Sequence, residues 1–126
     1  MESTVYSAPG VPAPAANYSP AIRRGPVLAV SGQVAYLPGQ LTGPPMGIED
    51  QARAVFGNLR AVLAAAQASL SDVVMVRIYL AREEDFATMN KVFDETFAPP
   101  FPARTTVWVT LPAGLLIEVD LLAVTA

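Results

Sequence analysis

The apolar residues between Ile48 and Ala66 recur at intervals of three and four, and this spacing constrains the fold more than any other feature of the chain. Residues at this spacing lie along one face of a helix with 3.6 residues per turn. The sequence therefore predicts a helix of about twenty residues with one buried face. Glu49 and Asp50 in its first turn suit the positive end of the helix dipole. The apolar positions are Ile48, Ala52, Val55, Phe56, Leu59, Val62, Leu63 and Ala66.

Four other segments have the pattern of β-strands, with β-forming apolar residues between turn signals. They are residues 27–33, 73–80, 105–111 and 115–124. In the second segment Arg77 and Tyr79 lie opposite the apolar face, which predicts a half-buried strand. That apolar face would hold Val74, Val76, Ile78 and Leu80. The turn signal at residues 112–114 predicts that the last two strands pair as a hairpin.

A second helix is predicted from about residue 84 to residue 97, where Pro99 and Pro100 follow. Its buried side would carry Phe86, Met89, Phe93 and Phe97. The resulting order of strand, helix, strand, helix, strand, strand predicts an α+β fold, a mixed sheet with two helices packed on one face. The opposite face of such a sheet needs another cover, for which we expect a second subunit.

The length of 126 residues predicts a single domain over residues 1–126. Residues 1–20 are expected to form an extended, Pro-rich N-terminal arm, in which the four prolines of residues 8–20 exclude regular structure from that part. A further turn-rich segment spans residues 38–47. Hydrophobic residues make up 52% of the chain and charged residues 15%, a surplus of apolar surface that favours a closed homo-oligomer over a merely well-filled core.

The chain has no Cys and no His, which excludes thiol nucleophiles, imidazole bases and the usual zinc sites. Dinucleotide-binding and P-loop signatures are also missing, so no cofactor and no metal are expected. The net charge is −3 and the eight basic residues are scattered, which disfavours nucleic acid as a partner. Prolines interrupt the longest uncharged stretch, residues 25–48, and the N-terminus has no secretion signal, so we expect no membrane association and a cytoplasmic location.

Two charged residues are candidates for chemistry. Glu118 lies in an almost wholly apolar strand, where burial would raise its pKa and make it a proton acceptor; alternatively its face looks into solvent. Arg104 precedes a strand after two prolines and suits a carboxylate ligand, although an ordinary surface arginine would fit the same position. The predicted hairpin would bring these two strands side by side. Tyr18 and Asn90 are weaker candidates, since either residue would serve equally well in packing.

Several segments together resemble the reactive intermediate deaminase (Rid, or YjgF) family, in order and spacing, over nearly the whole chain. In particular, Tyr18 stands thirteen residues before Ser31, as the family pattern requires. The segments are APAANYSPAI, VSGQ, IEDQARAVFGNLRAVLAAA, SLSDVVMVRIYLAREEDFATMNKVF, FPARTTV and LLIEVDLLAV.

The resemblance implies a chorismate-mutase-like fold, a homotrimer and three sites in the clefts between subunits. It implies that Arg104 binds a substrate carboxylate and that Glu118 activates the attacking water. The pocket would also be shaped by Tyr18, Ser31, Gly32, Asn90 and Thr106. The implied reaction is hydrolysis of 2-imino acids and their enamine tautomers, such as 2-aminoacrylate, to 2-oxo acids and ammonia without a cofactor.

The chain departs from the family pattern near these residues. Pro20 stands where Gln is common, Thr106 where Cys is frequent, and the segment between Arg104 and Glu118 is one residue shorter. Two alternatives therefore stay open: a regulatory trimer that binds small carboxylates without turnover, and an imine hydrolase specialised for one biosynthetic pathway. Ribonuclease activity, attributed to some relatives, is disfavoured by the acidic balance and the absence of His.

Overall fold

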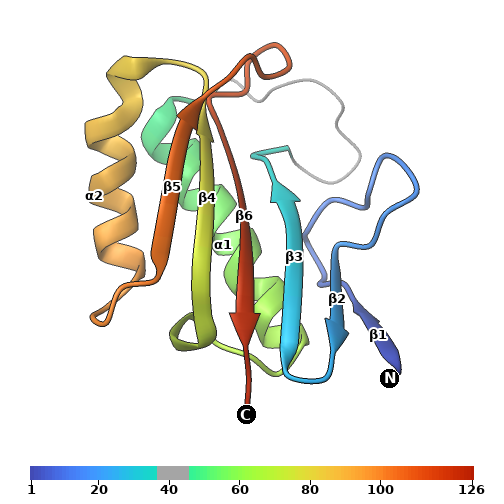
Figure 1. Cartoon of the computed structure of the whole chain (residues 1–126). Helices are drawn as coiled ribbons and strands as arrows, with labels where there is room; N and C mark the ends of the chain where they lie inside the picture. The colour runs from blue at the N-terminus through green and yellow to red at the C-terminus, as the bar shows by residue number, and fades with distance from the viewer. Residues whose placement is uncertain (37–45) are drawn as a thin grey trace.

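The computed structural model describes residues 1–36 and 46–126, so most of the turn-rich segment 38–47 lies outside the described residues. Two short 3-10 turns, Leu70–Asp72 and Glu83–Asp85, accompany the main elements. In chain order (Figure 1) these are β1 (Ser3–Tyr6), β2 (Ala21–Arg24), β3 (Val27–Gln33), α1 (Ile48–Ala65), β4 (Val73–Leu80), α2 (Phe86–Thr96), β5 (Ala103–Trp108) and β6 (Ile117–Val124).

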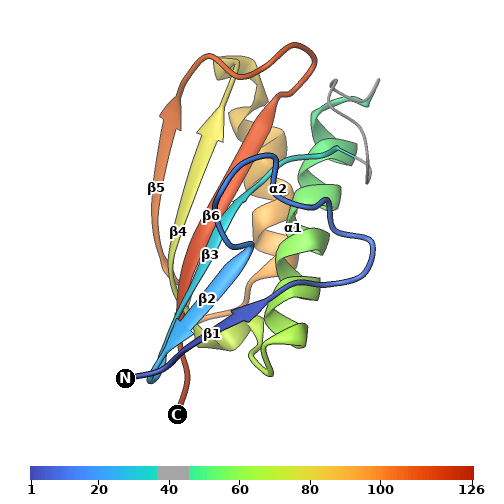
Figure 2. The same ribbon diagram turned by 90° about the vertical axis from the view of Figure 1, so that its right-hand side faces the viewer.

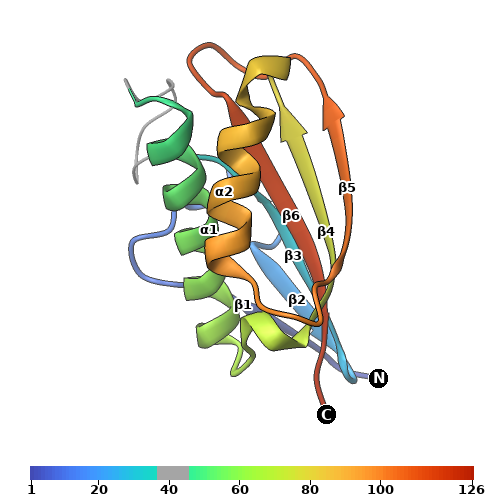
Figure 3. The same cartoon turned by 90° about the vertical axis from the view of Figure 1, so that its left-hand side faces the viewer.

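The strands form one mixed sheet in the order β1-β2-β3-β6-β4-β5. Only the β4–β5 pair is parallel among the described pairings, and the others are antiparallel. Both helices lie on the same face of the sheet, as Figures 2 and 3 show from opposite sides. The predicted α+β fold, with two helices on one face of a mixed sheet, is confirmed.

The core lies between the helices and the sheet. Seven of the eight predicted apolar positions of the first helix are buried, with Ile48 packed at the edge. From β6 the core receives Ile117, Val119, Leu121 and Ala123, so the intervening residues Glu118, Asp120, Leu122 and Val124 point to the opposite face. Neither helix of the described chain has the length and apolarity that a bilayer crossing requires.

The face without helices carries an apolar row that crosses five strands. The register pairs Val5 with Ile22, Ile22 with Ala29, Ala29 with Leu122, and Leu122 with Met75. Val5 is 57% exposed and Ile22 38% exposed. In the described parts of the chain no helix covers this row (Figure 2), so its apolar surface is open to a partner.

The predicted hairpin between the last two strands is wrong. β5 pairs with β4 in parallel, whereas β6 pairs with β3 and β4, so β4 lies between β5 and β6. The reason is that β4, α2 and β5 form a strand–helix–strand unit, in which the helical crossover returns the chain parallel to its first strand. The turn signal at residues 112–114 specifies a local reversal and does not specify which strand becomes the neighbour.

Residues 8–20 have no helix or strand, as their prolines predict, whereas residues 3–6 at the start of the arm form β1. β1 pairs with β2, which in turn pairs with β3 through a two-residue turn at Gly25 with φ +55°. One smaller expectation is wrong. Val74 does not share the buried face of β4, since the register shifts between Val73 and Met75 and leaves Val74 47% exposed.

Gln51 fastens the first turn of α1 to the segment that leads into β6. Its side chain is fully buried and makes three hydrogen bonds of 2.9 Å. Nε2 donates to the carbonyl oxygens of Met46 and Gly114, and Oε1 accepts from the backbone N–H of Leu116. Since Leu116 directly precedes β6, this single amide fixes the start of the strand that carries Glu118.

We expect Gln51→Leu to lower the free energy of unfolding by about 2 kcal/mol, because it removes three hydrogen bonds and leaves one backbone donor and two backbone acceptors without their partner. Urea unfolding followed by circular dichroism measures the change. Arg60→Leu on the exposed side of α1 is the matched control and should change stability by less than about 0.5 kcal/mol. A Gln51 variant as stable as the control would contradict the fastening role.

Candidate ligand-binding site

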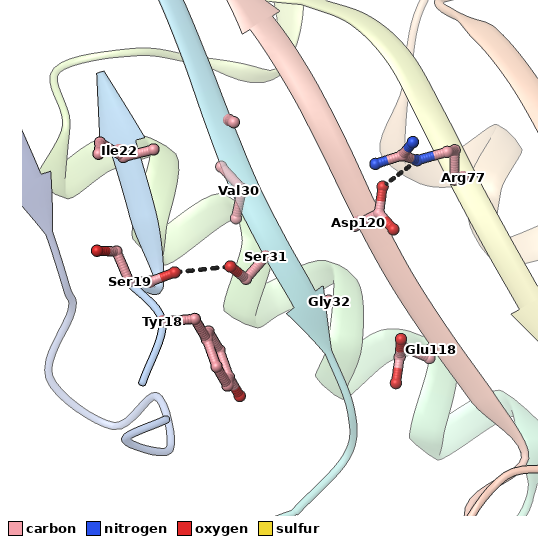
Figure 4. A pocket seen from close by; sticks show the side chains of 10 residues that line it. Tyr18, Ser19, Ile22, Val30, Ser31, Gly32, Arg77, Glu118 and Asp120 are labelled. Carbon is pink, nitrogen blue, oxygen red and sulfur yellow. Dashed lines mark hydrogen bonds and ion pairs between the residues drawn. The ribbon is translucent and has the colours of Figure 1, made fainter. Parts of the chain in front are cut away.

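A pocket of about 470 Å³ opens on the face of the sheet without helices (Figure 4). It is lined from β2, β3, β4 and β6 and from the end of the N-terminal arm. Four of the seven predicted site residues line it: Tyr18, Ser31, Gly32 and Glu118. Arg77 and Asp120 complete the polar part of its wall.

An irregularity of β3 shapes the pocket floor. Val30 pairs with Leu121 and Gln33 with Val119, so Ser31 and Gly32 together lie opposite a single residue of β6. Such a β-bulge bends a strand and redirects its side chains, and bulges often occur beside functional sites. Ser31 is held there by the arm, because its Oγ donates to the carbonyl oxygen of Ser19 at 2.6 Å and its N–H to that of Pro20 at 2.9 Å. The arm therefore brings Tyr18 to the pocket edge.

Glu118 is the half-buried carboxylate of the pocket. Burial raises its pKa above the ordinary value, and the negative charge of Asp120, two residues along the same strand, raises it further. A carboxylate with a raised pKa is a stronger base when ionised, which suits it to accept a proton. Of the sequence-based interpretations of Glu118, the structure therefore favours partial desolvation.

Gly32 leaves the space that Glu118 occupies. A Cβ atom on Gly32 would lie 2.7 Å from Oε2 of Glu118, closer than real Cβ atoms approach, and 3.0 Å from its Cδ. Figure 4 shows Gly32 between Tyr18 and Glu118 at the end of β3. The glycine thus allows the carboxylate to lie directly against the bulge.

Arg77, Tyr79 and Asp120 form a second polar group beside Glu118. Arg77 Nε donates to Asp120 Oδ1 at 2.6 Å, and the Tyr79 hydroxyl donates to Oδ2 at 2.9 Å. The Asp120 carboxylate raises the pKa of both Arg77 and Tyr79, so the guanidinium stays charged and the phenol stays protonated. Arg77 was not among the predicted site residues, although opposite charges on the open faces of β4 and β6 were a signal that could have identified it.

The other three predicted site residues lie elsewhere, in a group that we call the β5–α2 cluster: Asn90, Arg104 and Thr106. Arg104 and Thr106 pair with Val76 and Ile78, whose side chains are buried under the helices, so they share the helix-covered face. The Arg104 guanidinium lies 4.8 Å from the ring centroid of Phe93 and 5.8 Å from that of Phe86, and Asn90 falls between these two residues on α2.

Two polar atoms of the β5–α2 cluster are buried without a hydrogen-bond partner among the described residues. They are Asn90 Oδ1 and Thr106 Oγ1. A buried polar atom without a partner is costly in a folded protein. The cluster therefore offers an arginine and two unsatisfied polar atoms at the outer edge of the sheet.

The sheet separates the pocket from the β5–α2 cluster. Three strand spacings lie between β3 and β5, which corresponds to about 14 Å, and the two groups point to opposite faces. One small ligand cannot contact both groups of a single chain. Within residues 1–36 and 46–126, no group of three or more His, Cys, Asp or Glu side chains is placed to hold a metal ion.

The fold and the pocket define a class of small α+β proteins with a ligand site on an uncovered sheet face, and comparison with known proteins identifies the family. The family model described as "Endoribonuclease L-PSP" matches residues 9–125. The chain therefore belongs to this family, the Rid or YjgF family, and the resemblance read from the sequence is confirmed.

Individual relatives match over nearly the whole chain. A RutC family protein of Pyrococcus horikoshii is 42% identical, with 98% of each chain covered. The 2-iminobutanoate/2-iminopropanoate deaminase of Dermatophagoides farinae is 38% identical, over 95% of this chain and 94% of its own. The crystal structure of RidA from the Antarctic bacterium Psychrobacter sp. PAMC 21119 superposes with a TM-score of 0.88 at 34% identity, covering 96% of this chain and 98% of that one.

Some relatives have names that place them in mitochondria or chloroplasts. Family membership therefore does not assign a compartment, and the cytoplasmic location stays a prediction.

We expect Glu118→Gln to raise the free energy of unfolding at pH 7. The raised pKa means that the folded state binds this proton more tightly than the unfolded state, so ionisation costs stability as pH rises above the unfolded value of about 4.3. The neutral amide avoids that cost, and the gain should vanish below about pH 4. Urea unfolding at both pH values measures it.

Glu49→Gln is the matched control with the opposite sign. Hydrogen bonds and charges from Lys91 and Arg53 lower the pKa of Glu49, so its ionised form stabilises the fold above the unfolded pKa. The control should therefore be slightly less stable than the wild type at pH 7. A Glu118→Gln protein that loses stability at pH 7 would contradict the desolvation of this carboxylate.

We expect Gly32→Ala to move the Glu118 carboxylate away from β3 toward solvent, because the new methyl group would occupy its place. The pKa of Glu118, followed by carbon NMR of the labelled carboxyl, should then fall toward the ordinary value. Gly57→Ala, where a Cβ meets nothing within 4 Å, is the control and should leave that pKa unchanged. An unchanged pKa in the Gly32 variant would show that the close approach does not hold the carboxylate.

Proposed function

We propose that this protein is a cofactor-independent hydrolase of 2-imino acids, which it converts to 2-oxo acids and ammonia. The observation that carries the proposal is the half-buried carboxylate of Glu118, with its raised pKa, in a pocket of small-molecule size. Membership of a family that includes a 2-iminobutanoate/2-iminopropanoate deaminase 38% identical to this chain supports the same reaction class.

The chemistry needs few protein groups. A protonated imine carbon is already electrophilic, so the site must orient it and remove a proton from the attacking water. Ionised Glu118 accepts that proton as the carbon–oxygen bond forms, and then passes it to the nitrogen of the tetrahedral intermediate. The carbon–nitrogen bond breaks as the hydroxyl becomes the carbonyl, and the hydroxyl proton goes to the departing ammonia, which leaves as ammonium. The balance is one iminium and one water consumed, one 2-oxo acid and one ammonium released. Tyr18 and the bulge at Ser31 and Gly32 confine the substrate beside Glu118.

The substrate carboxylate needs a cation, which we assign to Arg104 of a neighbouring subunit. Within one chain Arg104 lies on the opposite face of the sheet from Glu118, so only a second copy can bring the two side chains to one ligand. Asn90 and Thr106 would accompany Arg104, since Asn90 Oδ1 and Thr106 Oγ1 have no hydrogen-bond partner in the described chain. A bidentate guanidinium grip would then fix the imino acid through its carboxylate.

The apolar row on the open face supports the assembly that this assignment requires. A homotrimer would bury that row, and in a cyclic arrangement each pocket would meet the β5–α2 cluster of the next subunit. A trimer with three sites between subunits is therefore part of the proposal.

The charge distribution supports a small ligand rather than RNA, although the family model is described by an endoribonuclease name. Four of the eight basic residues already form ion pairs with carboxylates: Arg53, Arg77, Arg82 and Lys91. The net charge is −3, which opposes the approach of a polyanion.

We expect Arg104→Ala and Glu118→Gln each to reduce imine hydrolysis by at least about a hundredfold. The first variant loses the cation that binds the substrate carboxylate, and the second loses the base that accepts the proton of water. When the two inactive proteins are unfolded together, mixed in equal amounts and refolded, activity should return to about a quarter of the wild-type value if trimers assemble at random. A mixed trimer contains sites whose Arg104 and Glu118 are both intact, supplied by different subunits.

Activity is measured with 2-imino acids that an amino-acid oxidase generates in situ, from the decrease in semicarbazone formed with semicarbazide. Each inactive protein refolded alone is the control and should stay inactive. Mixed protein without recovered activity, with trimers verified by light scattering, would contradict a shared site. Tight binding of 2-oxo acids by a wild-type protein that hydrolyses no imine would favour the carboxylate-binding alternative.

A further inference from the structure

We propose that Arg77 binds a second carboxylate, on the side chain of the substrate, so that the site prefers dicarboxylic 2-imino acids. This inference rests on the proposed function, because it assigns the substrate class of the same pocket. The evidence for the second carboxylate site is separate from the evidence for hydrolysis, because Arg77 has no role in the hydrolysis mechanism.

Arg77 reaches the pocket from β4. It pairs across the strands with Asp120, and its side chain is 56% exposed although its Nε atom is fixed by the 2.6 Å bond to Oδ1 of Asp120. Figure 4 shows the guanidinium extending from β4 toward β6, beside Asp120, on the face that carries the pocket. The cation is therefore held in place and yet open to the cavity.

The guanidinium keeps donors for a ligand. Asp120 occupies the Nε–H, while the N–H groups on Nη1 and Nη2 have no hydrogen-bond partner among the described residues. A guanidinium can bind carboxylates along separate edges, so a pair with Asp120 does not exhaust it. The Tyr79 hydroxyl donates a hydrogen bond to the other oxygen of Asp120, which weakens the repulsion between Asp120 and a bound anion.

The other charged residues of the pocket are acidic, so a bound carboxylate depends on Arg77 for a positive partner. Glu118 and Asp120 both line it, and Arg77 is the basic residue among its described lining residues. A substrate with one carboxylate would be held through Arg104 of the neighbouring subunit and would leave the free edge of Arg77 to water. A substrate with two carboxylates would pair both cations, one at each end, and place its imine carbon between them beside Glu118.

The test compares two substrates of equal chain length, the imino acids that oxidases form from glutamate and from norvaline. We expect the wild type to hydrolyse 2-iminoglutarate with the higher kcat/KM and Arg77→Gln to lower the ratio of the two kcat/KM values at least about tenfold. Calorimetry with 2-oxoglutarate and 2-oxopentanoate supplies a readout that needs no catalysis, and the same variant should lose the preference for 2-oxoglutarate.

Two further variants separate the cation from its partner. Arg77→Gln with Asp120→Asn removes the ion pair without leaving a lone carboxylate and should lose the preference as well. Tyr79→Phe retains Arg77 and should keep the preference for the dicarboxylate. A double variant that prefers the dicarboxylate, or an Arg77→Gln protein that weakens both substrates equally, would overturn the assignment.

The outcomes also separate this inference from the proposed function. Hydrolysis of both imino acids without any preference by the wild type would refute the role of Arg77 and leave the deaminase intact. Preferential binding of 2-oxoglutarate through Arg77, in a protein that hydrolyses neither imino acid, would refute the deaminase and support the second carboxylate site.

Discussion

Two helices cover one face of a six-stranded sheet and leave the other face open, and the remaining features depend on this asymmetry. Along β6 the alternation of side chains sends Ile117, Val119 and Leu121 into the core and Glu118 and Asp120 outward. The Glu118 carboxylate therefore lies on a strand whose other face is buried in the core. Gln51 adds to this rigidity, since its three hydrogen bonds fix the segment just before β6.

The open face combines features that a protein optimised for stability alone would avoid. A desolvated carboxylate, a strand bulge and an apolar row exposed to solvent each lower the stability of an isolated chain. Their concentration on one face, beside a pocket, is typical of a surface that is not optimised for stability alone. Gly32 belongs to this group of features, because a side chain there would displace the Glu118 carboxylate from its place against the bulge.

Most of the fold could be predicted from the sequence because the helical period of residues 48–66 and the alternation in residues 73–80 are local signals that agree with the final packing. Strand order was not predictable in this way: the turn before Leu115 indicated a hairpin, and the crossover through α2 placed β4 between the two strands instead. β1 was missed because its short pairing with β2 has no signal beyond the prolines that follow it.

The candidate site was predictable in part. Glu118 could be identified as a polar residue within an apolar strand, and Tyr18, Ser31 and Gly32 through the family resemblance. The separation of Arg104 from Glu118 depends on the face that each side chain occupies in the assembled sheet, which neither residue's local sequence determines. Arg77 required the register between β4 and β6, because only their pairing shows that it meets Asp120 at the pocket wall.

The sheet divides the chemistry of this chain into two compartments that can evolve independently. The charged residues that line the pocket lie on strands β4 and β6, whereas Arg104 lies on β5 against the aromatic rings of α2. A substitution on the open face can therefore alter the charge that a ligand meets without disturbing the packing of Arg104. A lineage of such proteins can change the charge of the open face while the packing on the helix-covered face stays the same.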